Sequence, residues 1–409
     1  MWTKHNFSRR DFLISGTTLF ASISLKLYSE EQNSFLSFDD EMENFIKERL
    51  IPGATLAVFN KGKIIYARGY GYADIKEKIK PEPSTLFRIA SLSKPVTAAG
   101  ILKLFEEGKI DIDSPVVEYL KKLGIDKNIV DNRWYKISVK NLLQHTGGWD
   151  SKKSGDPMFY YPAKFVQEKN RAIKPIDVVE YMFGKPLDFD PGSKYVYSNF
   201  GYCVLGRVIE AVSGLNYEDY INRYILRPAG INDMHIGSVE YSKKRKNEAT
   251  YYTAFNNPQM ADLPDDKKEN ANPYGSFNIE IMDSHGGWIA SAVEFAKFCL
   301  TFSEYSPVKI LKPSTIKKII EPPPYLSDKN HEVYYGLGWL VRPKGASGKP
   351  NLWHSGSLPG SYSFAVILGD SRGWVALFNG RSADDKNYPN DAIDAALHRA
   401  AAKMKQFPD

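Results

Sequence analysis

Apolar and polar positions follow two different periodicities along the chain, and the helical one appears first. Apolar residues recur at helical spacing over 39–50, and two strand-like runs follow over 54–59 and 63–70. The tripeptide Asn60-Lys61-Gly62 separates these runs, which predicts a β-hairpin. A second helical pattern begins at Ser91 and ends near Gly108.

The middle of the chain, 115–274, is mainly helical in pattern, with few strand signals. Helical patterns there cover 139–143, 176–183 and 202–212, and long polar loops cover 150–171 and 241–274. Loops of that length in a compact domain usually form the rim of a functional site. We therefore expect both loops to border a cleft.

Strand patterns return in the last hundred residues. A helix is predicted over 293–302, strands over 335–341, 352–356, 362–368 and 374–378, and a final helix over 390–404. This order predicts an α+β fold in which the first two strands pair with the last three in a five-stranded antiparallel sheet flanked by helices. The α/β lobe would comprise 39–114 and 275–405, with a helical lobe, 115–274, inserted between them.

Composition excludes several functional classes. The chain of 409 residues is 43% hydrophobic and 25% charged, which is typical of a folded globular protein. A net charge of +6, without a basic stripe carrying aromatics, does not predict nucleic-acid binding. Its two cysteines, Cys203 and Cys299, are too few for a disulfide scaffold, and no histidine pair has metal-ligand spacing. No apolar run in the body of the protein is long enough to span a bilayer.

The N-terminus carries a pattern typical of an export signal. Ser8-Arg9-Arg10-Asp11-Phe12-Leu13 contains paired arginines, and an uncharged, largely apolar run follows over 12–25. We interpret 1–30 as a twin-arginine signal segment and 31–409 as one domain; a disordered basic tail is the alternative. The interpretation predicts a bacterial protein that acts in the periplasm or elsewhere outside the cytoplasmic membrane.

The tetrapeptide Ser91-Leu92-Ser93-Lys94 is the strongest chemical signal. Residues three apart on a helix share a face, so Lys94 would lie over the Ser91 hydroxyl. A serine hydroxyl needs a neighbouring base, and an amine can act as one only when its pKa is depressed. Taken alone, the pattern also fits a helix N-cap serine beside a solvated lysine.

Two further segments supply polar groups of suitable chemistry. Tyr197-Ser198-Asn199 lies between a Pro-Gly loop and an apolar helix, where the tyrosine could shuttle a proton and the asparagine could bind a substrate amide. The third segment, His354-Ser355-Gly356-Ser357, ends one strand. Its glycine would let a substrate lie along the strand edge, and the Ser357 N–H could join that of Ser91 as an oxyanion hole.

In this order, S-x-x-K, Y-x-N and H-S-G resemble the motifs of the serine β-lactamase and DD-peptidase family, and are closest to its class C branch. The resemblance covers roughly 40–400 and implies a β-lactamase/transpeptidase-like fold. It implies that Ser91 forms an acyl-enzyme, that Lys94 and Tyr197 transfer the proton, and that Asn199 binds the acyl side chain. A neighbouring cation and a dry cleft would depress the Lys94 pKa.

The third motif departs from the pattern of efficient β-lactamases of this type, which carry lysine where this chain has His354. That lysine helps to hold the antibiotic's carboxylate, so a neutral histidine weakens the case for strong cephalosporinase activity. Histidine at this position is similar to some DD-carboxypeptidases and D-amino-acid peptidases.

We therefore predict a monomeric, cofactor-free serine hydrolase that binds no metal and acts on a small-molecule or peptide substrate. A carboxylesterase of the family VIII type and a penicillin-binding-like sensor that acylates slowly remain alternatives, because all three share the same acyl-enzyme chemistry. Gly369-Asp370-Ser371-Arg372-Gly373 also matches a G-x-S-x-G nucleophile elbow. Since it joins two strand runs, we interpret it as a hairpin loop.

Overall fold

The computed structural model describes residues 35–408 except 161–162, 254–255, 259–271, 276, 327–330, 382–389 and 405. The predicted signal segment, 1–30, and part of the 241–274 loop lie outside the described residues. The helices are α2 Leu36–Glu48, α3 Ser93–Glu106, α4 Val117–Leu120, α5 Val139–Leu143, α6 Ser151–Ser154, α7 Ala163–Lys169, α8 Pro175–Phe183, α9 Asn199–Ser213, α10 Tyr217–Ile221, α11 Ala292–Leu300, α12 Pro313–Ile319 and α13 Asn390–Lys403. Among them, none combines the length and the apolar character that crossing a bilayer requires.

A large antiparallel sheet organises the described chain. Its strands, in spatial order, are β2 Lys63–Gly71, β1 Gly53–Asn60, β10 Gly373–Phe378, β9 Ser361–Ile367, β8 Asn351–Leu358, β7 Leu340–Arg342 and β6 Tyr334–Tyr335. A smaller sheet has the order β3 Phe87–Arg88, β5 Trp288–Ala290 and β4 His235–Ile236. The pairing of the N-terminal hairpin with the C-terminal strands is therefore confirmed, through β1 and β10.

The sheet has two more strands than the five predicted. The run 335–341 was expected to be one strand, but it divides into β6 and β7, which pair with each other in an antiparallel hairpin. Gly338 adopts a φ of +87° in the intervening turn, which only glycine accommodates easily. An added Cβ there would lie 2.3 Å from the Cβ of Ala98 on α3, so close packing against that helix also requires glycine.

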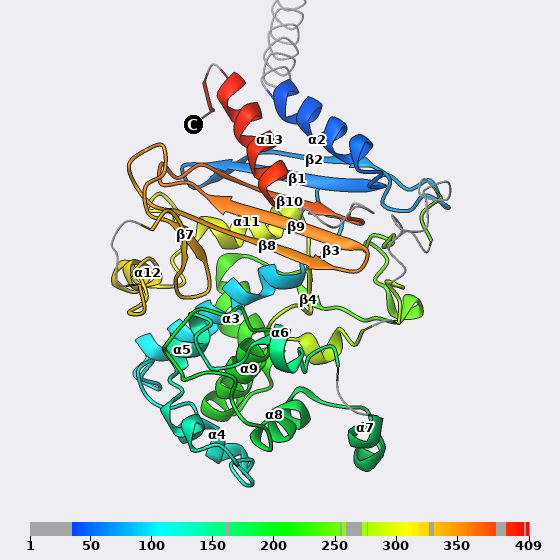
Figure 1. Ribbon diagram of the computed structural model, residues 1–409. Helices are drawn as coiled ribbons and strands as arrows, with labels where there is room; N and C mark the ends of the chain where they lie inside the picture. The colour runs from blue at the N-terminus through cyan, green and yellow to red at the C-terminus, as the bar shows by residue number, and fades with distance from the viewer. Residues whose placement is uncertain are drawn as a thin grey trace, which may run out of the picture.

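Apolar side chains fill both faces of this sheet. Helices α2 and α13 lie together over one face (Figure 1), where Phe38 and Leu397 pack with Leu56 and Trp374 in one cluster. The opposite face packs on α11 and continues into the helical part of the molecule. Strand β1 is buried along its whole length, which explains why its sequence lacks a polar alternation.

Strand β8 brings the third motif against the segment that carries Ser91. Its first residues pair with β7, from Asn351 to Trp353, whereas 354–358 pair only with β9 among the described strands. An added Cβ on Gly356 would lie 2.3 Å from the Ile89 carbonyl oxygen and 2.7 Å from the Ser91 nitrogen. The glycine therefore makes room for the protein's own backbone, a reason that the sequence did not suggest.

We predict that Gly356→Ala displaces the Ser91 turn, because neither backbone atom can withdraw without moving the strand or the turn. The free energy of unfolding should fall by about 1–3 kcal/mol, as expected for overpacking. The rate of p-nitrophenyl ester hydrolysis, which reports on the acyl-enzyme chemistry predicted from the sequence, should fall about 100-fold or more. Denaturant titration and steady-state kinetics would measure the two effects.

Gly184→Ala is a suitable control for this substitution. Gly184 has a negative φ, and its added Cβ would meet only one atom, at 3.4 Å. The activity of Gly184→Ala should stay within about twofold of wild type. Full activity in Gly356→Ala would contradict the packing argument.

Candidate active site

Ser91 occupies a 3₁₀ turn, Ala90–Leu92, between β3 and α3. The preceding residue, Ala90, has a φ of +47°, which is unfavourable for a residue with a side chain and is tolerated where the surroundings enforce it. The Ile89 N–H donates to the Trp288 carbonyl at 3.0 Å, and the Ser363 hydroxyl donates to the Ile89 carbonyl at 2.6 Å. These contacts hold the turn between β5 and β9, and Ser91 is half-buried rather than sealed.

Lys94 lies in the first turn of α3 and is completely buried. Its Nζ is 3.0 Å from Ser91 Oγ, 2.8 Å from Asn199 Oδ1 and 2.9 Å from the His285 carbonyl oxygen. A neutral amine has two N–H donors and one lone pair. When the amide and carbonyl oxygens accept the two hydrogens, the lone pair is left for the Ser91 hydroxyl.

Burial is the main influence on the Lys94 pKa and lowers it well below its ordinary value. The dry surroundings expected from the sequence are therefore present. The expected neighbouring cation is not what acts on Lys94; the charge that acts is the Asp156 carboxylate, which raises the pKa and opposes burial. The Lys94 pKa is nevertheless lowered overall, which favours a neutral amine that can accept a proton.

Tyr197 also lies beside Lys94, whose Nζ is 4.7 Å from the centroid of the tyrosine ring. Desolvation raises the pKa of Tyr197 well above its ordinary value, and a hydrogen bond with Ser91 offsets part of the increase. The side chain is therefore a phenol at neutral pH. Of the two groups beside Ser91, Lys94 is suited to accept a proton and Tyr197 to donate one.

The loop that carries Tyr197 is fixed by His145, which belongs to the segment after α5. The Val196 N–H donates to the His145 carbonyl at 2.9 Å, and the Ser198 N–H donates to His145 Nδ1 at 3.0 Å. The imidazole also lies 4.2 Å from the Tyr197 ring. Burial lowers the His145 pKa well below its usual range, so a neutral ring supports Tyr197.

Asn199 is the first residue of α9, whose N-cap Ser198 accepts the Gly201 N–H. Its Oδ1 accepts from Lys94, and its Nδ2 donates to Asp156 Oδ2 at 2.8 Å. Both ends of the amide therefore contact protein groups. S-x-x-K and Y-x-N, 105 residues apart at Lys94 and Asn199, form one connected hydrogen-bond network.

His354, the first residue of the third motif, is almost completely buried. The Ser355 carbonyl can only accept, so Nδ1 carries the proton in their 2.6 Å contact, and Nε2 accepts from the Tyr335 hydroxyl at 2.9 Å. Burial and the neighbouring Lys94 lower the His354 pKa to about 3. The ring is therefore neutral at physiological pH and contributes no fixed charge.

The other residues of this motif lie along β8. Ser355 and Ser357 are half-buried on one face of the strand, and Gly356 lies against the Ser91 turn. Arg381, which follows β10 in the chain, donates from Nη1 to Ser357 Oγ at 3.0 Å. A guanidinium therefore lies beside the third motif, although His354 itself is uncharged.

Sequence reasoning missed several residues that complete the site. Asp156, His285, Tyr335 and Arg381 were not assigned a role from the sequence. Asp156 and Arg381 stand in loop segments without a motif, so no local pattern could identify them. His285 contacts Lys94 through its backbone carbonyl, which is independent of side-chain type.

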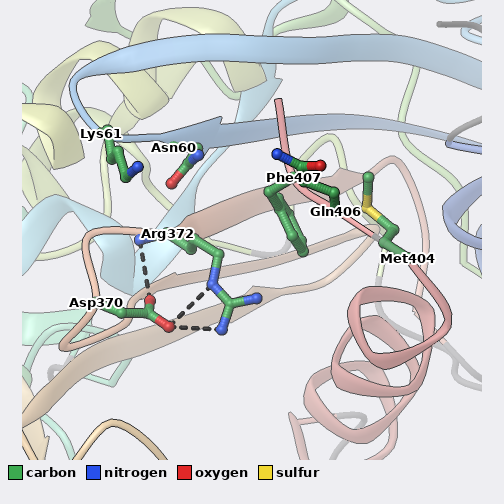
Figure 2. A pocket seen from close by; sticks show the side chains of 7 residues that line it. All are labelled: Asn60, Lys61, Asp370, Arg372, Met404, Gln406 and Phe407. Atoms are coloured by element: carbon green, nitrogen blue, oxygen red, sulfur yellow. Dashed lines mark hydrogen bonds and ion pairs between the residues drawn. The ribbon is translucent and has the colours of Figure 1, made fainter. Parts of the chain in front are cut away.

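The alternative nucleophile elbow is a hairpin loop, as predicted, between β9 and β10. Figure 2 shows Asp370 and Arg372 of this loop joined by an ion pair beside Phe407. They line a cavity of about 420 Å³ that shares no residue with the Ser91 site. Within the described residues, Cys203 and Cys299 are free and buried, and no group of three or more acidic, His or Cys side chains has the arrangement of a metal site.

Comparisons with known proteins agree with this arrangement. A family model described as Beta-lactamase matches residues 38–398. Penicillin-binding protein 4* of Bacillus subtilis (strain 168) is 26% identical over 382 residues, which are 93% of this chain and 79% of that protein. Protein flp of Staphylococcus aureus (strain N315) is 25% identical over 80% of this chain, and the chain spans only 59% of its length.

Two solved structures share the fold. The octameric penicillin-binding protein homologue from Pyrococcus abyssi is 25% identical with a TM-score of 0.68, over 90% of this chain and 77% of that chain. The D-amino acid amidase from Ochrobactrum anthropi SV3, complexed with L-phenylalanine amide, is 21% identical with a TM-score of 0.68. The match covers 92% of this chain and 99% of that chain. The fold is thus β-lactamase/transpeptidase-like. Because the family model matches most of the residues, this chain belongs to the beta-lactamase family and is a beta-lactamase-related serine hydrolase.

Proposed function

We propose that the chain cleaves amide or ester bonds through an acyl-enzyme on Ser91 and that its activity resembles that of DD-peptidases. The observation that carries this proposal is the 3.0 Å contact between Ser91 Oγ and the fully buried Nζ of Lys94. An amine in water would be protonated at neutral pH, whereas burial favours the neutral form that can take the serine proton.

In the proposed reaction, Ser91 Oγ attacks the substrate carbonyl carbon while its proton passes to Lys94 Nζ. The tetrahedral intermediate then collapses, the bond to the leaving group breaks, and Tyr197 gives its proton to that group. Lys94 returns the proton to Tyr197, and a water molecule later hydrolyses the acyl-enzyme by the reverse sequence of proton transfers. The high pKa of Tyr197 supports its role as the proton donor.

Backbone N–H groups of Ser91 and Ser357 would stabilise the oxyanion. The close approach of Gly356 to the Ser91 nitrogen supports this pairing, because it places the two segments side by side. Such donors typically contribute about 10²–10³ in rate. The role belongs to the backbone, so the side chain of Ser357 remains available for other contacts, including the one with Arg381.

The substrate proposed is a short peptide with D-residues and a terminal carboxylate. His354 is neutral and cannot hold that carboxylate by charge, but Arg381 lies on Ser357, at the strand where the leaving group would bind. The similarity to a penicillin-binding protein and to a D-amino acid amidase supports the choice of a D-residue substrate. A guanidinium recognises a carboxylate through paired N–H donors.

We predict that Arg381→Gln lowers kcat/KM for a peptide ending in D-Ala-D-Ala by roughly 10- to 100-fold, the usual effect of a lost charged hydrogen bond. Arg381→Gln should hydrolyse the same peptide with a C-terminal amide at nearly the wild-type rate, because that peptide offers no negative charge to the guanidinium. Arg372→Gln is the matched control, since Arg372 pairs with Asp370 away from the site. Equal losses for acid and amide would contradict a carboxylate contact.

We predict that Ser91→Ala abolishes covalent chemistry, because no other nucleophile takes part in the proposed reaction. Intact-mass spectrometry of residues 30–409 should show an adduct of the wild type with a β-lactam, and none with Ser91→Ala. An adduct or hydrolysis that survives in Ser91→Ala would refute the proposal.

Turnover in the same experiment separates the alternatives. Product release from the D-Ala-D-Ala peptide identifies a peptidase, and release only from a p-nitrophenyl ester identifies a carboxylesterase. An adduct that persists without product identifies a slowly acylating sensor.

We also propose export through the twin-arginine pathway, supported by the sequence pattern around Arg9 and Arg10. Replacing both arginines by lysine should retain the protein in the cytoplasm, because the pathway reads the paired guanidinium groups rather than charge alone. Cell fractionation followed by immunoblotting would measure this. Unchanged export would exclude the twin-arginine interpretation and leave the Ser91 chemistry unaffected.

A further inference from the structure

Asp156 is a half-buried carboxylate that lies two hydrogen bonds from the proposed base. Its Oδ2 accepts from Asn199 Nδ2 at 2.8 Å, and Asn199 Oδ1 accepts from Lys94 Nζ at 2.8 Å. We propose that Asp156 is a positioning residue that fixes the orientation of the Asn199 amide and thereby directs the lone pair of Lys94 at Ser91. The inference rests on the proposed function, in which Lys94 is the base.

The chemistry of the two amide ends makes this orientation depend on Asp156. An ionised carboxylate can only accept hydrogen bonds, so the Asn199 group that faces it must be the NH₂. The carbonyl oxygen of the same amide must then face Lys94. A residue at 156 that could also donate a hydrogen bond would allow the Asn199 amide to rotate by half a turn, which exchanges its NH₂ and carbonyl ends.

The orientation decides where the Lys94 lone pair points. With Oδ1 of Asn199 and the carbonyl of His285 as acceptors, both hydrogens of the neutral amine are engaged, and the lone pair faces Ser91 Oγ. With the amide turned over, its NH₂ would face Nζ and donate to the lone pair. Lys94 would then be a poorer base towards Ser91, although every residue of the three motifs is present.

Asp156 is itself held in place by its own loop. Its Oδ1 accepts the Met158 N–H at 3.0 Å, and its carbonyl accepts the N–H groups of Phe159 and Tyr160 at 3.1 and 3.0 Å. The Met158 side chain is buried and anchors this turn. The carboxylate therefore presents a fixed acceptor to Asn199.

Asp156 also carries the charge that acts on Lys94. Among the described residues, the other titratable groups around Lys94 are His285 beside β5, His145 after α5, His354 on β8, Tyr197 and, on α9, Tyr202. Burial lowers the pKa of each histidine and raises the pKa of each tyrosine, so all five are neutral at neutral pH. Removal of the Asp156 charge should therefore lower the Lys94 pKa.

The test measures kcat/KM for p-nitrophenyl acetate against pH in the full chain and in Asp156→Asn. This ester has no ammonium or carboxylate, so a change cannot arise from a lost contact between Asp156 and a charged substrate. We expect a roughly 10- to 100-fold fall of the plateau. The acid limb of this pH profile is the range in which activity rises as Lys94 loses its proton. It should move to lower pH in Asp156→Asn, because the pKa of Lys94 falls when the negative charge is removed.

Two further variants make the result decisive. Asp156→Glu keeps the charge, so its acid limb should lie closer to wild type than that of Asp156→Asn. Asp188→Asn is the matched control, because Asp188 binds the same loop, through the Asp150 N–H and the Ser154 hydroxyl, without contacting Asn199. It should leave the acid limb in place. Thermal unfolding of each variant would show that all are folded.

Three results would overturn the inference: an unchanged plateau in Asp156→Asn, an unmoved acid limb, or the same two changes in Asp188→Asn. Ser91→Ala, measured with the same ester, separates this failure from failure of the proposed function. If Ser91→Ala is inactive and Asp156→Asn is unaffected, only the role of Asp156 is wrong. If Ser91→Ala retains activity, the Ser91 mechanism itself is wrong.

Discussion

The complete burial of Lys94 beside Ser91 is the interaction on which the rest of the site depends. An amine removed from water loses the solvation that favours its charged form, so the packing that buries Lys94 also lowers its pKa and suits it to accept a proton. Burying such a group is tolerable only if its hydrogens find acceptors, and Asn199 and the His285 carbonyl provide them. The acceptors come from α9 and from the turn before β5, so the hydrogens of Lys94 are satisfied only once distant parts of the chain have come together.

The neighbouring elements hold the Ser91 turn and the Tyr197 loop in place, through backbone contacts as much as through side chains. The strained Ala90, the pairing of Ile89 with Trp288 and the close approach of Gly356 hold the Ser91 turn between two strands. His145 does the same for the loop of Tyr197, with a neutral ring rather than a charge. A frame of this kind maintains short distances, such as the 3.0 Å between Lys94 Nζ and Ser91 Oγ.

Charge around the site is distributed differently from what the third motif alone suggests. His354 is neutral because it is buried beside Lys94, whereas Arg381 introduces a guanidinium at Ser357 and Asp156 a carboxylate at Asn199. The anion and the cation therefore contact different motifs, one at the asparagine of Y-x-N and the other on β8. Both charges come from loop residues that lie outside the three motifs.

The sequence by itself determined the longer helices and strands, the pairing of the first hairpin with the last strands, and the three motifs, because periodicity, element order and local spacing carry that information. S-x-x-K identified Ser91 and Lys94 because residues three apart meet within one helical turn. The sequence could not show the division of 335–341 into two strands, since that depends on Gly338 packing against α3. Nor could it identify Asp156, Arg381 or the His285 carbonyl, which lie far from the motifs along the chain. Only the tertiary structure decided the state of Lys94, because desolvation and hydrogen-bond partners arise from residues that meet after folding.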